Sequence, residues 1–193
     1  MDAAAILVIS DSHGNLPALT AALRWAARQD GAAQRPWRGP LTGGVFLGDG
    51  AADLERAAAE AGLSLPWYAV RGNGDYDLSL PAVRTVEIAG RGLFLTHGNH
   101  YGVEDGLEAL AAAAKATGAE AALFGHTHIP RRVPAEGETP FLLNPGSIGR
   151  PRSAAGHTFA ILELRPGAPP GAEFYRLVKR GLTWVDARPF ADR

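Results

Sequence analysis

Ile6-Leu-Val-Ile9-Ser-Asp11-Ser-His13-Gly-Asn-Leu-Pro17 is the stretch on which the interpretation of the whole chain rests. Ile6–Ile9 is a short apolar run that predicts a buried strand, and residues 17–29 carry apolar side chains at helical spacing. Asp11 and His13 lie between them, two positions apart, so both side chains can point the same way from an extended backbone. The stretch predicts a strand, a polar loop and a helix, with two potential metal ligands in the loop.

The same change from an apolar strand to a polar loop recurs along the chain. These further loops contain Gly48-Asp49, Gly72-Asn73, Thr96-His97-Gly98 and Gly125-His126-Thr-His128. Glycine lets the backbone turn sharply beside each polar side chain. Because loops at one edge of a sheet are where α/β proteins gather functional groups, we expect these side chains to converge.

The remaining pattern predicts the fold class. Helices are expected at residues 54–61 and 103–117, and strands of alternating pattern dominate the second half, at residues 141–143, 158–164, 173–178 and 182–185. The sequence therefore predicts an α/β fold, a two-sheet mixed β sandwich flanked by helices. We expect residues 1–193 to form a single domain, because the chain length suits one core.

Composition excludes several classes of protein. A formal net charge of −1 argues against a basic nucleic-acid binder, and we expect no long nucleic acid as a partner. The chain has no cysteine, so a metal site must use nitrogen and oxygen ligands. The apolar run at residues 3–9 is too short to span a membrane, which leads us to expect no membrane association and a cytoplasmic location.

Each polar motif alone has an ordinary structural explanation. Asp11-Ser-His13 is typical of a helix cap, and Gly48-Asp49 and Gly72-Asn73 are typical of turns. His126-Thr-His128 is stronger, since paired histidines beside a glycine are uncommon as core residues. All the motifs follow one another at successive predicted strand ends, which favours a common metal site. The predicted ligands are Asp11, His13, Asp49, Asn73, His97, His126 and His128.

The order of these motifs resembles the calcineurin-like metallophosphoesterases, in particular their small single-domain bacterial and archaeal phosphodiesterases. The resemblance extends from the loop of Asp11 through Leu47-Gly-Asp49, Arg71-Gly-Asn73, Leu95-Thr-His-Gly98 and Gly125-His-Thr-His128 to Asn144-Pro-Gly-Ser147. It covers most of the chain except the last forty or so residues.

The resemblance implies two divalent metal ions. One ion would be held by Asp11, His13, Asp49 and His128, and the other by Asp49, Asn73, His97 and His126. Asp49 would then bridge the ions, which would activate a water as the nucleophile and bind the phosphate oxygens. The mixture of ligands favours manganese, with iron, nickel, cobalt and zinc as alternatives.

The chain departs from the family at two positions that affect catalysis. Gly74 follows Asn73 where many relatives carry histidine or cysteine, and glycine has no side-chain proton to donate. Asn99 stands where relatives commonly have the second histidine of a His-Gly-His motif, and His100 follows one residue later. The predicted catalytic residues are Asp49, Asn73 and His100, with His100 either replacing the missing acid or facing solvent.

The favoured function is therefore a metal-dependent phosphodiesterase, a phosphoric ester hydrolase acting on a small phosphate ester. Phosphomonoester or nucleoside-polyphosphate hydrolysis is one alternative. A weakly active scaffolding module is another, since one branch of the fold serves as a retromer subunit. Residues 34–44 contain Trp37 among prolines and glycines, and we expect this loop to border the site or to contact a second protomer in a homodimer.

Overall fold

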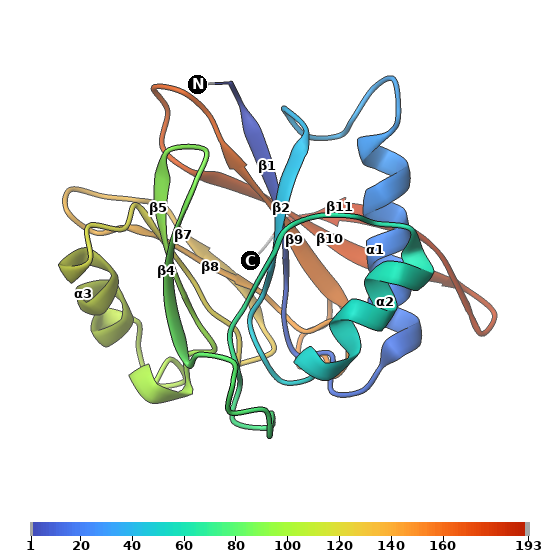
Figure 1. Cartoon of the computed structure of the whole chain (residues 1–193), viewed down its shortest axis with the longest axis horizontal. Helices are drawn as coiled ribbons and strands as arrows, with labels where there is room; N and C mark the ends of the chain where they lie inside the picture. The colour runs from blue at the N-terminus through green and yellow to red at the C-terminus, as the bar shows by residue number, and fades with distance from the viewer. Residues whose placement is uncertain (1, 192–193) are drawn as a thin grey trace.

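Two mixed β-sheets pack against each other, with helices on their outer faces, in the computed structural model, which describes residues 2–191 (Figure 1). The strand order is β11-β10-β9-β1-β2-β3 in the first sheet and β4-β5-β6-β8-β7 in the second. The two-sheet α/β fold predicted from the sequence is confirmed.

The elements have the following bounds. The strands are β1 (Ala4–Ile9), β2 (Leu41–Phe46), β3 (Trp67–Ala69), β4 (Val83–Ile88), β5 (Arg91–Thr96), β6 (Ala121–Leu123), β7 (Pro130–Val133), β8 (Phe141–Pro145), β9 (Thr158–Leu164), β10 (Gly171–Arg180) and β11 (Thr183–Phe190). The helices are α1 (Leu16–Asp30), α2 (Leu54–Ala61), α3 (Glu108–Ala116) and the short 3-10 helices η1 (Ala51–Asp53) and η2 (Asn99–Tyr101).

β1 lies at the centre of the first sheet, parallel to β2 and antiparallel to β9. It is apolar on both faces because both are covered. Ile6 and Val8 pack in the core between the two sheets, whereas Leu7 and Ile9 pack in the core beneath α1. The strand is thus fixed from both sides, and the loop that follows it has a rigid base.

α1 begins where the sequence predicts, directly after the loop of Asp11 and His13. The Asn15 side chain accepts a hydrogen bond from the Ala18 N–H at 3.2 Å and caps the helix. Pro17 follows at the start of the helix, where its missing N–H costs nothing. The cap fixes the point at which the loop must end.

α3 covers the second sheet but is shorter than the predicted helix of residues 103–117. It begins at Glu108 and ends at Ala116. Gly106 precedes it, and glycine destabilises a helix interior by about 1 kcal/mol, so the turn at residues 102–105 does not continue into the helix. The strand β7 was not predicted, because Pro130 opens it and its two arginines break the apolar pattern.

The loop containing Trp37 does not border the polar loops, which corrects that expectation. It lies beside the N-terminal end of β1, where the Pro40 carbonyl accepts a hydrogen bond from Ala5 N–H at 2.9 Å (Figure 1). Trp37 is buried, and its ring centroid lies 5.8 Å from that of Trp25 on α1. The tryptophan therefore closes the core under α1 at the far end from the polar loops.

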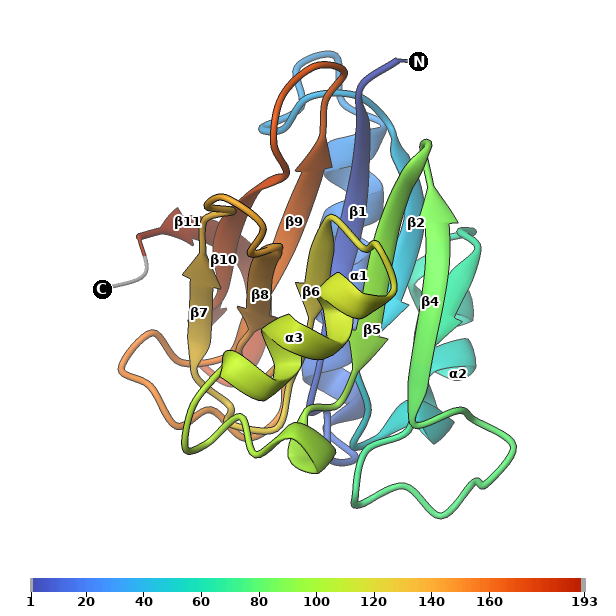
Figure 2. The same ribbon diagram turned by 90° about the vertical axis from the view of Figure 1, so that its left-hand side faces the viewer.

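The polar loops lie at the edge of the sheets opposite the loop of Trp37. β1, β2 and β3 run parallel to one another, and so do β5, β6 and β8. Figure 2 shows the loops that follow β1, β3, β5 and β6 at the lower edge of both sheets. Among residues 2–191, no helix has the length and apolarity needed to cross a membrane.

Candidate metal centre

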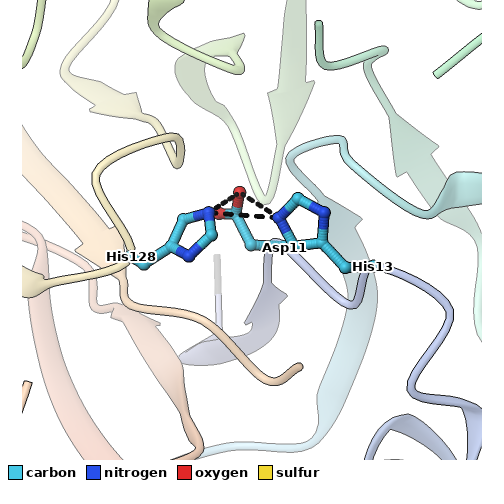
Figure 3. Close-up of side chains that lie close together, drawn as sticks. All are labelled: Asp11, His13 and His128. Carbon is cyan, nitrogen blue, oxygen red and sulfur yellow. Dashed lines mark hydrogen bonds and ion pairs between the residues drawn. The ribbon is translucent and has the colours of Figure 1, made fainter. Parts of the chain in front are cut away.

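Five of the predicted ligands meet where the two sheets join. The side chains of Asp11, His13 and His128 form one group with their oxygen and nitrogen atoms within 4.8 Å of one another, and Asp11, Asp49 and His97 form a second (Figure 3 shows the first group). Asp11 belongs to both groups. The residues come from the loops after four different strands, so the sheet topology brings them together.

The backbone of these loops is strained. Asp11, His13, Asp49, His126 and His128 all have positive φ angles, between 44° and 70°. Within residues 2–191, Ala89 is the one other residue that has a positive φ without being glycine. A left-handed conformation costs a residue with a side chain about 1 kcal/mol or more, and such strain concentrates at functional sites. Four of the five clustered residues are among them, so the strain lies in the loops that carry the cluster.

The Asp11 carboxylate is anchored through one oxygen only. Its Oδ2 accepts hydrogen bonds from the Ser10 hydroxyl at 2.5 Å and from the His126 N–H at 3.2 Å. Its Oδ1 is buried and has no hydrogen-bond partner, although it lies 3.1 Å from His128 Nε2. The geometry leaves Oδ1 free to bind a cation.

Asp49 shows the same division between its oxygens. The Gly74 N–H donates to Asp49 Oδ1 at 2.6 Å. Oδ2 instead faces two histidines, lying 3.6 Å from His97 Nε2 and 3.7 Å from His13 Nε2. Asp49 Oδ2 therefore lies between His13 and His97.

Backbone carbonyls fix the orientation of two histidine rings. His97 Nδ1 lies 2.7 Å from the Leu47 carbonyl oxygen, and His128 Nδ1 lies 2.5 Å from the Arg150 carbonyl oxygen. A carbonyl only accepts, so Nδ1 must carry the proton in each ring and Nε2 presents a lone pair to the centre. Metal-binding histidines are typically held in this way.

Burial and the neighbouring carboxylates shift the pKa values of two histidines in opposite directions. Burial lowers the pKa of His13, although the Asp49 and Asp11 carboxylates act against this effect. Interaction with the Asp11 carboxylate raises the pKa of His128, against the effect of burial. The two Nε2 atoms lie 3.1 Å apart.

These groups fit divalent cations. Asp11 Oδ1 and His97 Nε2 are both buried without a hydrogen-bond partner. Leaving a buried polar atom unpaired costs about 1–3 kcal/mol, so native proteins rarely tolerate such atoms without a function. Carboxylate oxygens and imidazole nitrogens suit divalent transition metals. A bound cation would satisfy both atoms.

Three predicted residues lie outside this cluster. Asn73 is exposed, and its side chain makes no polar contact within residues 2–191. His126 packs its ring 5.2 Å from that of His97, but its Nε2 lies 3.6 Å from Glu104 Oε2. His100 is exposed on η2, without a hydrogen bond or ion pair to the described residues.

Sequence analysis missed the residue that organises the loop of Asp49. Asp75 Oδ2 accepts hydrogen bonds from the N–H groups of Asp49 and Gly72, each at 2.8 Å. Its Oδ1 accepts from Gly50 at 2.7 Å and from Ala51 at 3.1 Å. Its place directly after the Gly72-Asn73-Gly74 turn was the available signal, because aspartates in turns commonly accept backbone N–H groups.

Asn144 and Ser147 hold the loops of the two histidines and of Asp11. The Asn144 side chain donates to the Gly125 carbonyl at 2.7 Å, and Ser147 Oγ donates to the Asp11 carbonyl at 2.8 Å. The Asn-Pro-Gly-Ser motif at residues 144–147 therefore supports the centre without belonging to it.

A cavity of about 420 Å³ opens beside the cluster. His13, Asp49 and Arg150 are among the residues that line it. The loop after β3 also lines it, through residues that include Gly74 and Tyr76. The arrangement offers a space for a small molecule next to a cation-binding cluster.

Comparison with known proteins agrees with this geometry. Residues 5–167 match the family model described as the calcineurin-like phosphoesterase superfamily domain. The chain is 30% identical over 164 residues to the probable metallophosphoesterase YsnB of Bacillus subtilis (strain 168), covering 84% of this chain and 86% of the relative.

Solved structures show the same fold at lower identity. A predicted phosphoesterase from Streptococcus pneumoniae TIGR4 has a TM-score of 0.70 at 24% identity, covering 98% of each chain. Vps29 from Entamoeba histolytica complexed with zinc has a TM-score of 0.66 at 19% identity, covering 97% of this chain and 99% of that one. An archaeal phosphodiesterase has a TM-score of 0.60 at 22% identity, covering 82% and 92%.

Proposed function

This chain belongs to the calcineurin-like phosphoesterase superfamily, and from that premise we propose that it is a phosphodiesterase that acts on small phosphodiesters with two divalent metal ions. The name of the curated relative supports metal-dependent ester hydrolysis. The archaeal structural neighbour, itself described as a phosphodiesterase, supports the choice of diesters.

One observation carries the proposal: buried acceptor atoms converge without partners. Asp11 Oδ1 and His97 Nε2 are unpaired, and Asp49 Oδ2 lies between His97 and His13. Asp11, His13, Asp49 and His128 would hold one ion, and Asp49, Asn73, His97 and His126 the other. The ions would supply Lewis acidity, binding phosphate oxygens and making a water nucleophilic near neutral pH.

The protein's own residues position the reacting groups. Asp49 is held by the Gly74 N–H at 2.6 Å, so its free oxygen keeps one direction. Arg150 lines the adjacent cavity, and a guanidinium group is well suited to binding a phosphate oxygen. Asn73 is exposed near the centre and must turn inward to become a ligand. His100 is the candidate proton donor to the departing alcohol.

The mixed nitrogen and oxygen donors favour manganese in this proposal, with zinc, iron, nickel and cobalt as alternatives. Scaffolding is the second candidate function, and Gly74 favours it, because glycine cannot protonate a leaving group. A pure scaffold gains nothing from strained, unpaired ligands, however. The positive φ angles of Asp11, Asp49 and His128 therefore favour catalysis.

The experiment is hydrolysis of a chromogenic phosphodiester and its monoester by protein stripped with a chelator. Each assay is run with and without manganese, beside Asp49→Ala. We expect manganese to restore diester hydrolysis in the wild type and not in the variant, with the monoester hydrolysed more slowly. Faster hydrolysis of the monoester would favour the phosphomonoesterase alternative. Absence of turnover despite bound metal would favour the scaffold.

A further inference from the structure

Two groups of residues line the cavity beside the metal centre. The first group is His13, Asp49 and Arg150, where a phosphate would lie under the proposed function. Residues of η1 and of the loop after β3 also line the cavity, and we call them the outer wall. Figure 2 shows that loop projecting from the lower edge of the sheets. A phosphodiester bound at the centre has two organic arms, and this cavity is adjacent to where one of them must extend.

Gly74 lines the cavity and packs closely against the Asp49 carboxylate. A Cβ atom added there would lie 3.1–3.3 Å from the Asp49 carboxylate atoms, which is tighter than an ordinary contact. Glycine avoids that crowding while its N–H still donates to Asp49. The absence of a side chain thus avoids a close contact with the Asp49 carboxylate at the edge of the cavity.

The outer wall carries the carboxylates of Asp53 and Asp77, and neither forms an ion pair with another residue of the part of the chain that the structure describes. Asp53 precedes α2, yet its side chain makes no capping hydrogen bond. Asp77 accepts a hydrogen bond from Ser79 N–H at 2.9 Å and, within residues 2–191, has no ion-pair partner. Arg150 is the one arginine or lysine among the described residues that line the cavity. An anionic group beyond the phosphate would therefore meet two carboxylates.

The wall also offers apolar surface. Tyr76 lines the cavity with a side chain that is 98% exposed, and Leu80 lies on the same loop. A freely exposed aromatic ring has its face available to an apolar or cationic group. The carboxylates and the apolar surface of the outer wall thus both favour an apolar or cationic group.

We propose that this cavity selects the organic arm of the substrate, accepting an uncharged or cationic arm and rejecting one that bears an anionic group. The inference rests on the proposed phosphodiesterase activity. It makes nucleoside polyphosphates poor substrates, because phosphates beyond the reacting one would approach Asp53 and Asp77. It makes diesters of neutral or amino alcohols good ones.

The test uses three p-nitrophenyl phosphodiesters whose second arm is choline, its uncharged tert-butylethyl isostere, or carboxypropyl. We expect kcat/KM for the choline and tert-butylethyl diesters to exceed that for the carboxypropyl diester by about tenfold, the scale of a few partly screened charge contacts. In the double variant Asp53→Asn/Asp77→Asn, the ratio of kcat/KM for the preferred diesters to kcat/KM for the carboxypropyl diester should fall towards unity. Tyr76→Ala should raise KM for the two preferred diesters more than for the third.

Asp105→Asn is the matched control, because Asp105 is exposed and lines a different cavity, so the ratio should stay at the wild-type value. Asp77→Asn alone changes an exposed loop residue and should move the ratio in the same direction if the double variant folds poorly. Equal kcat/KM for all three diesters would overturn this inference and leave the phosphodiesterase intact. Absence of metal-dependent turnover on all three would overturn the proposed function and the inference with it.

Discussion

The Asp75 carboxylate accepts a hydrogen bond from the backbone N–H of Asp49 at 2.8 Å and so ties the loop after β3 to the loop after β2. Three further N–H groups, those of Gly50, Ala51 and Gly72, bind the same carboxylate. Four backbone N–H groups thus donate to the charged carboxylate of Asp75, and these hydrogen bonds fix the position of the Asp49 backbone.

Asp75→Asn tests this dependence. An asparagine has one acceptor oxygen, and its NH₂ group would face N–H donors that it cannot bind. We expect about 1–3 kcal/mol lower stability and about 10–100-fold weaker metal binding, as for lost support of metal ligands. Thermal unfolding and titration with manganese measure the two effects. Asp105→Asn, at an exposed position, should match the wild type; unchanged metal binding in Asp75→Asn would contradict the role.

Glu104 is expected to orient His126 for the second ion. The Glu104 carboxylate lies 3.6 Å from His126 Nε2, and carboxylates commonly hold the second nitrogen of metal-binding histidines. Glu104→Gln should weaken binding of the second manganese by about tenfold and leave the first almost unchanged. Calorimetry resolves the two binding steps, with Glu108→Gln as the matched control. Equal loss of both ions would show that Glu104 acts on general folding instead.

His100→Ala tests the proposed proton donor. An alkyl leaving group needs a proton, whereas p-nitrophenolate departs without one. If His100 supplies the proton, the variant should lose about 100-fold or more in kcat on an alkyl diester and little on the p-nitrophenyl diester. The comparison of the two substrates separates this role from binding. Equal rates of wild type and variant on the alkyl diester would assign His100 to the solvent-facing alternative.

Stability at alkaline pH depends on Tyr175. Burial, helped by Glu173 and Glu163, raises the pKa of Tyr175 to about 12, against about 10 in an unfolded chain. The folded state thus favours the protonated hydroxyl group. Its contribution to stability is complete below about pH 10 and is lost as the pH rises towards 12. The phenylalanine of Tyr175→Phe cannot ionise, so the free energy of unfolding of this variant should fall by up to about 2 kcal/mol less than that of the wild type between about pH 10 and 12. Chemical unfolding from pH 9 to 12 measures the difference, and parallel curves would contradict it.

The sequence predicted the fold class because its signals are local. Ile6–Ile9, the cap before α1 and the glycines after each strand act over a few residues, so periodicity and turn chemistry identify them. Helix ends were less certain, as the shorter α3 shows, since a single glycine at 106 shifted the start.

Sequence alone predicted the candidate ligands, because the ligand types and their positions at strand ends are properties of the chain, and the structure brings five of them together. Tertiary structure decided the rest. It set which oxygen of Asp11 and of Asp49 stays free, buried Trp37 at the opposite edge, and brought Asp75 to the backbone of Asp49. Such contacts join segments far apart in the chain, and their geometry depends on how two sheets pack, which no local pattern encodes.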